Sequence, residues 1–163
     1  MRIYGKTMLK QLVFHDRTME VKLSERAVQQ DKNLNLPLII EIQIYFSCLL
    51  GKRLAFYTDR ALDGAWQVEP ELFSSMQGDA RQLTENIFIR FNTVMTKTCP
   101  VSDYAGPPPV TDFKIKNLKP YVPTWLRIDY QNGLWCGEYG WPASVAGQMN
   151  TKQVRGNAIL ART

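Results

Sequence analysis

The chain has 163 residues, of which 45% are hydrophobic, 21% charged and 11% aromatic, and its mean hydropathy is −0.26. These values are typical of one compact water-soluble domain. The longest apolar stretch, 34–50, is interrupted by Pro37, Glu41 and Gln43 and falls short of the roughly 18 residues that a membrane helix needs. Because the start of the chain also lacks the apolar region of a signal peptide, we expect a cytoplasmic protein that makes no contact with a membrane.

The net charge of +5 points first to a nucleic-acid partner, but the basic residues are concentrated at the two ends of the chain. Residues 1–10 and 151–163 each contain three basic side chains and no acid, whereas the 140 residues between them contain 14 basic and 15 acidic side chains. The body of the chain is therefore close to neutral. We predict a single β-rich globular domain over residues 1–149 and a basic C-terminal tail over residues 150–163, and we do not favour nucleic acid as the partner.

The three cysteines, Cys48, Cys99 and Cys136, are an odd number at wide spacings, which is not the pattern of a disulfide framework. Cys48 and Cys136 lie in apolar segments, where cysteine is typically a small buried residue. His15 is the only histidine, so no group has metal-ligand spacing, and no glycine-rich phosphate loop occurs. The sequence therefore predicts neither a metal nor a cofactor.

Apolar and polar residues alternate with period two along much of the chain, which is the pattern of half-buried strands. The first strands are expected over 10–14 and 18–23, joined by a turn at 15–17. Ser24 then stands as a helix N-cap before several good helix formers. This pattern predicts a short helix over 24–32.

The middle of the chain predicts longer strands. Residues 38–50 are apolar on both faces in their second half, so we expect this strand at the centre of a sheet. Gly51 and Lys52 have the glycine-first pattern of a two-residue type II′ hairpin, after which 53–58 returns antiparallel. A further long strand is expected over 86–98.

A second helix and a proline-rich loop accompany these strands. Pro70, flanked by Glu69 and Glu71, is suited to the first turn of a helix and predicts a short helix through Met76. Residues 99–109 end in three successive prolines, which lack amide donors and exclude regular structure. We expect this segment to be a long connecting loop.

Three lysines between residues 113 and 119, among them Lys114 and Lys116, alternate with apolar residues and predict a strand with a basic outer face. Such lysines are common on the solvated side of an edge strand, where they discourage aggregation. With exposed side chains at Trp125 and Trp141, the same strand would also suit a single-stranded nucleic acid.

The strongest local signal is Asn132-Gly133 between two alternating runs, which predicts a hairpin with a two-residue type I′ loop. This loop fixes the register and places the aromatic residues on one face, the core face. The predicted pairs are Tyr130 with Trp135, Asp129 with Cys136, Ile128 with Gly137, Arg127 with Glu138, and Leu126 with Tyr139. On the other face, Arg127 and Glu138 are expected to form an ion pair across the strands. On the core face, Gly137 is expected to leave room over Ile128.

Together these elements predict an α+β domain. We expect a mostly antiparallel β-sheet of about six to eight strands, able to curl toward a barrel-like form, with two short helices.

Our first functional hypothesis is a non-catalytic binding or interaction module that holds a protein or a small-molecule partner on a sheet face or on the proline-rich loop. Exposed strand edges also favour a homodimer through a sheet edge. The candidate ligand- or partner-binding residues are His15, Asp16, Lys114, Lys116, Trp125, Arg127 and Trp141.

Two alternatives follow from the same residues. The first is a single-stranded nucleic-acid binder that uses the lysine-bearing strand and the exposed tryptophans. The second is a small hydrolase or isomerase, which would need an apolar cavity lined by the sheet, with Tyr45, Phe91 or Trp135 in its wall. His15 or a buried carboxylate would then be the base.

Overall fold

The computed structural model describes residues 2–4, 6–46, 50–96, 110–112 and 114–142. Four predicted features lie outside these residues: Cys48, Cys99, the proline-rich loop 99–109 and the tail 150–163. The strands are β1 (Arg2–Tyr4), β2 (Thr7–Phe14), β3 (Arg17–Leu23), β4 (Leu38–Phe46), β5 (Leu50–Thr58), β6 (Trp66–Gln67), β7 (Arg81–Gln82), β8 (Ile87–Thr96), β9 (Val110–Asp112), β10 (Trp125–Gln131) and β11 (Leu134–Gly140). The helices are α1 (Glu25–Asn33), α2 (Pro70–Gly78) and the short 3-10 helix η2 (Lys119–Tyr121).

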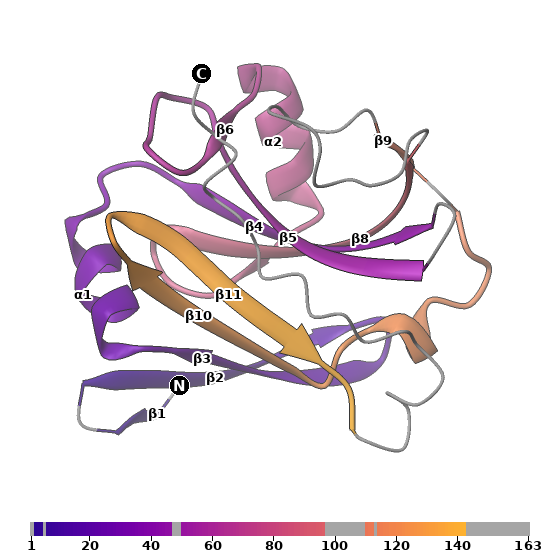
Figure 1. Ribbon diagram of the computed structural model, residues 1–163, viewed down its shortest axis with the longest axis horizontal. Coiled ribbons are helices and arrows are strands. Elements are labelled where there is room, and N and C mark those ends of the chain that lie inside the picture. Colours follow the sequence, from indigo (N-terminus) through magenta and orange to yellow (C-terminus); the bar gives the residue numbers. More distant parts are fainter. Residues whose placement is uncertain (1, 5, 47–49, 97–109, 113, 143–163) are drawn as a thin grey trace.

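The described strands form two sheets that lie one over the other (Figure 1). Sheet A has five strands in the order β1-β2-β3-β10-β11, and sheet B has six, in the order β6-β5-β4-β8-β7 with β9 beside β8. The helix α1 carries the chain from β3 in sheet A to β4 in sheet B, and the chain returns to sheet A at β10.

The predicted α+β class with two short α-helices is confirmed, but the mostly antiparallel, barrel-like arrangement is not. Both sheets are mixed, because β3 and β10, β4 and β8, and β5 and β6 run parallel. Each parallel pair needs a crossover connection, whereas the turn signals in a sequence report on antiparallel hairpins. The strands that the structure describes remain two open sheets and form no closed barrel.

The main core lies between the facing sides of the two sheets. Its buried residues include Ile40, Ile42 and Ile44 of sheet B and Val21, Leu126, Ile128 and Trp135 of sheet A. Burial of a side chain of this size stabilises the fold by roughly 1.5–3 kcal/mol. The helix α2 lies on the opposite face of sheet B (Figure 1). A second, smaller cluster forms there, in which Phe73 and Met76 of α2 pack against Ile39, Ala55 and Tyr57.

The predicted β10–β11 hairpin is confirmed residue by residue. All five predicted pairs occur in the register, and Asn132 and Gly133 have the positive φ values of 53° and 78° that a type I′ loop requires. A Cβ atom on Gly137 would lie 2.9 Å from Leu54 Cδ1 and 2.5 Å from the carbonyl oxygen of Arg127. The missing side chain therefore makes room for Leu54 of sheet B to approach, whereas the space over Ile128 stays a prediction.

Two local predictions are wrong: the hairpin loop at Gly51 and Lys52, and the lysine-bearing strand. Gly51 and Lys52 are not a hairpin loop: they lie inside β5 and pair with Tyr45 and Ile44 of β4. Glycine is suited to that position because the Tyr45 ring fills the space that a side chain on residue 51 would need. The lysine-bearing segment 114–118 is irregular rather than a strand, and η2 follows it.

The Tyr139 side chain of β11 connects the two sheets. Its hydroxyl donates a hydrogen bond to the Gln43 carbonyl oxygen of β4 and accepts one, at 3.1 Å, from the Arg53 amide of β5. From β5, the buried Lys52 ammonium donates to the Tyr139 carbonyl oxygen at 2.6 Å and lies 5.7 Å from the centre of the Trp141 ring. These contacts fix the position of sheet A over sheet B.

Candidate functional site

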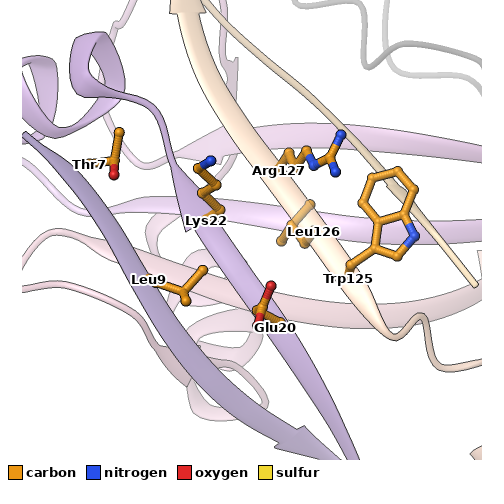
Figure 2. Close-up of a pocket in the computed structure, with 7 residues that line it drawn as sticks. All are labelled: Thr7, Leu9, Glu20, Lys22, Trp125, Leu126 and Arg127. Carbon is orange, nitrogen blue, oxygen red and sulfur yellow. The ribbon is translucent and has the colours of Figure 1, made fainter. Parts of the chain in front are cut away.

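A pocket of about 370 Å³ opens on the outer face of sheet A, the face that points away from sheet B (Figure 2). This volume is within the range of small-molecule sites. Three adjacent strands, β2, β3 and β10, supply its walls. The lining residues are Thr7, Leu9, Glu20, Lys22, Trp125, Leu126 and Arg127.

The strand register explains why these residues meet. Lys22 of β3 pairs with Leu9 of β2 on one side and with Arg127 of β10 on the other. Glu20 pairs with Trp125 in the next outward-facing row. Because side chains two residues apart share one face of a strand, this register gathers a tryptophan, two cations and a carboxylate around one hollow.

The close approach of Trp125 to Gly140 positions its indole ring on the sheet. Gly140 of β11 pairs with Trp125, and a Cβ on that glycine would lie only 2.6 Å from the indole atom Cζ2. The Arg127 guanidinium lies 5.0 Å from the centre of the indole ring, which is a cation–π contact. Trp125 is half-buried, so part of its ring remains available to a ligand.

The charged side chains of the pocket are only weakly neutralised. Arg127 pairs with Glu138 as predicted, but the distance is 3.9 Å and the Arg127 side chain is 66% exposed. Exposed pairs of this kind contribute about 0–1 kcal/mol. Within the part of the chain that the structure describes, neither Lys22 nor Glu20 takes part in an ion pair. The two cations of the pocket, Lys22 and Arg127, can therefore interact with an anionic group of a ligand.

Beside the pocket, Asp129 ties the hairpin to α1. Its carboxylate accepts hydrogen bonds from the Ser24 hydroxyl and from Nη2 of Arg26, the latter at 2.6 Å, while Ser24 also caps α1 by accepting from the Ala27 amide at 3.1 Å. Burial opposes ionisation of Asp129, but the hydrogen bonds from Arg26, Gln131 and Ser24 outweigh it and hold the pKa of this carboxyl well below its usual range. The carboxylate is thus committed to the fold rather than to a ligand.

The structure brings two of the predicted binding residues together in the pocket, Trp125 and Arg127. Lys114 and Lys116 are exposed but do not line it. Trp141 is only 7% exposed and donates from its indole nitrogen to the Tyr121 carbonyl oxygen at 3.2 Å. The tryptophan pair that the nucleic-acid alternative uses is therefore divided between the surface and the core.

His15 and Asp16 form the turn between β2 and β3, away from the pocket lining. Both have positive φ values, 49° and 62°, which are uncommon for residues other than glycine. The His15 ring meets the Phe91 ring edge-on, with their centres 6.0 Å apart. This ring contact lies at the end of the β2–β3 hairpin, where His15 reaches sheet B.

The residues expected to line an enzyme cavity do not all lie on the same side of sheet B. Trp135 is 1% exposed and belongs to the core between the sheets, which Phe91 contacts from sheet B. Tyr45 projects from the opposite face of sheet B, since Ile44 and Phe46 on either side of it face that core. These three side chains do not share a cavity wall.

Sequence reasoning did not select Thr7, Leu9, Glu20 or Lys22 for the site. The strict alternation over 18–23 places Glu20 and Lys22 on the solvent face, and that signal was present. What the sequence lacks is a local signal for the parallel pairing of β3 with β10, about a hundred residues later, which brings these side chains beside Trp125.

Comparison with protein-family models, with curated proteins and with solved structures gave no match. Among the described residues, no helix has the length and apolar character needed to cross a membrane. The same part of the chain contains no cluster of three or more His, Cys, Asp or Glu side chains that would hold a metal ion.

Proposed function

We propose that the protein is a non-catalytic binding module whose ligand occupies the pocket on the outer face of sheet A. The ligand class follows from the lining. Trp125 offers a flat apolar surface, Lys22 and Arg127 offer positive charge, and Glu20 offers an acceptor. These groups suit a small molecule that combines a flat ring with an acidic group.

The observation that carries this proposal is the meeting of Trp125, Arg127 and Lys22 in one hollow. Arg127 and Lys22 are a register pair, and Trp125 is the adjacent outward-facing residue of β10. Binding residues supplied by rigid strands are held in place before the ligand arrives, which lowers the entropic cost of binding.

Isothermal titration calorimetry of the full chain tests the proposal with three probes: indole-3-acetate, 4-hydroxybenzoate and adenosine 5′-monophosphate. We expect at least one probe to bind, and Trp125→Ala and Arg127→Ala each to weaken its affinity about tenfold, which is about 1.4 kcal/mol. The matched control is Lys114→Gln with Lys116→Gln, which removes exposed charge outside the pocket and should leave the affinity unchanged. Absence of binding by all three probes at millimolar concentration would overturn the proposal.

Oligo-deoxythymidine provides the comparison with single-stranded nucleic acid. That alternative predicts tight, strongly salt-dependent binding that depends on Lys114 and Lys116 as much as on Arg127. The proposal of a small-molecule pocket predicts that Lys114→Gln with Lys116→Gln has no effect on any ligand. It also predicts weak salt dependence, because the described lining contains two cations, Lys22 and Arg127.

A homodimer through a sheet edge remains a separate proposal. In sheet A the edge strands are β1 and β11, and the Lys52 ammonium already occupies the Tyr139 carbonyl oxygen of β11. Sedimentation equilibrium of the full chain would measure the monomer–dimer ratio directly.

A further inference from the structure

A row of buried polar side chains lies on the outer face of sheet B, next to the part of that face that α2 covers. Glu41, Gln43 and Arg53 are 2%, 1% and 8% exposed. Glu41 and Gln43 lie on β4, and Arg53 lies opposite Gln43 on β5. Buried polar groups are costly unless they are hydrogen-bonded, so the partners of each group decide what the row does.

The buried carboxylate in this row is that of Glu41, and it is paired with Arg90. The Glu41 carboxylate accepts a hydrogen bond from Arg90 of β8 and another, at 2.7 Å, from the Gln43 amide. Arg53 is left with a neutral partner: its Nε and Nη2 atoms both donate to the Gln43 side-chain oxygen. No described carboxylate lies within ion-pair distance of Arg53. Arg53 is therefore a buried cation that bonds to a neutral amide, and the Glu41 charge that attracts it is shared with Arg90.

Tyr45 lies beside this cation and offers a second donor. On β4 it is two residues beyond Gln43 on the same face, and its ring rests over Gly51 of β5, so that a side chain on Gly51 would displace it. Its hydroxyl makes no hydrogen bond with any described residue. Burial raises the pKa of Tyr45, which keeps the hydroxyl protonated and able to donate. Tyr45 is half-buried, so part of its side chain reaches solvent.

We propose that Arg53 and Tyr45 form a binding site for an oxyanion, a carboxylate or a phosphate group, on the outer face of sheet B. A guanidinium edge and a phenol hydroxyl on one face are the donors that such a group takes. An incoming anion would neutralise a charge that the fold has already removed from water, whereas an anion at an exposed arginine must compete with full hydration. This site is separate from the sheet A pocket and does not depend on the proposed function.

Nuclear magnetic resonance of the arginine Nε–Hε groups tests the site on the full chain, with inorganic phosphate and acetate as probes at constant ionic strength in chloride. One arginine Nε–Hε resonance, identified by its loss in Arg53→Lys, should shift saturably with at least one probe. A response to phosphate alone identifies a phosphate group as the ligand, and a response to acetate alone identifies a carboxylate.

Two variants make the test specific. Tyr45→Phe removes a hydroxyl that bonds to no described residue, so it should leave the melting temperature without anion unchanged but weaken anion binding severalfold. Arg53→Lys keeps the charge but loses the fork of donors, and it should weaken binding about tenfold or more. Arg60→Lys, at an exposed arginine outside both proposed sites, is the matched control and should bind the anion as the unaltered protein does.

The proposal is overturned if neither anion shifts the Arg53 resonance saturably. It is also overturned if Tyr45→Phe binds as tightly as the unaltered protein. Since Tyr45→Phe leaves the buried row intact, this second result stands even if Arg53→Lys does not fold.

Discussion

The bridge that Tyr139 makes between the sheets yields a quantitative prediction for Tyr139→Phe. The change removes one hydroxyl and keeps the ring, which is 1% exposed. It leaves two backbone groups without their bridge, the Gln43 carbonyl and the Arg53 amide. Each buried polar group that loses its partner costs about 1–3 kcal/mol, and a partial approach of β4 to β5 recovers some of this. We expect a loss of about 3 kcal/mol in the free energy of unfolding.

Equilibrium urea unfolding at neutral pH measures this loss directly, and for a domain of this size about 3 kcal/mol corresponds to a fall of about 6–12 °C in Tm. Tyr130→Phe is the matched control. The Tyr130 ring packs edge-on against Trp135 at 5.3 Å, and its hydroxyl bonds to no described residue. The control should stay within about 0.5 kcal/mol of the unaltered protein. If Tyr139→Phe lost no more than Tyr130→Phe, the bridge would not hold the sheets together.

Three further predictions concern pH and the turns. Burial raises the pKa of Tyr57 to about 12 and holds that of Tyr139 well above its ordinary value, so unfolding releases protons at high pH. The free energy of unfolding should therefore be unchanged below the unfolded tyrosine pKa of about 10 and fall as the pH rises above it. A series of urea curves measures this fall, which should be shallower in Tyr57→Phe. Asp129→Asn should cost about 1–2 kcal/mol at neutral pH. Because the folded pKa of Asp129 is depressed, the contribution is complete above the unfolded pKa of about 3.9, and urea curves should show the variant and the unaltered protein converging as the pH falls below it. Gly133→Val should lower the free energy of unfolding by about 1–2 kcal/mol, because φ at this position is 78°. No atom of the described residues lies within 4 Å of a Cβ there, so the loss reports backbone strain and not a clash. Gly78→Ala, at a helix end with open space, is the control and should leave the free energy of unfolding unchanged in the same assay.

The parts of the fold that were predictable are those whose signals are local. Asn132-Gly133 fixed one register, and that register then placed Arg127 opposite Glu138. Ser24 similarly predicted the start of α1, where its hydroxyl accepts from the Ala27 amide. In both cases, residues a few positions apart determine the geometry.

The parts that were not predictable depend on contacts between distant segments. Gly51 looks like a turn residue until the Tyr45 ring is seen to cover it, which depends on the pairing of β4 with β5. The lysines at 114 and 116 alternate as in a strand, yet the structure gives that segment no strand partner among the described residues.

The candidate sites divide in the same way. Trp125 and Arg127 were both among the residues selected from the sequence, and both lie on β10 of the predicted hairpin. Lys22 joins them only through the parallel pairing of β3 with β10. Arg53 was assigned correctly to a strand, but its burial beside a neutral amide is a property of the folded sheet.

The most direct test of the proposed binding function is to map the ligand on the folded chain. Titration of the ¹⁵N-labelled protein with whichever ring acid binds in calorimetry should shift the amides of Leu9, Lys22 and Arg127 and the indole N–H of Trp125, with smaller effects on sheet B. Shifts confined to the outer face of sheet B, or to the irregular segment at 114–118, would contradict the placement of the ligand on sheet A.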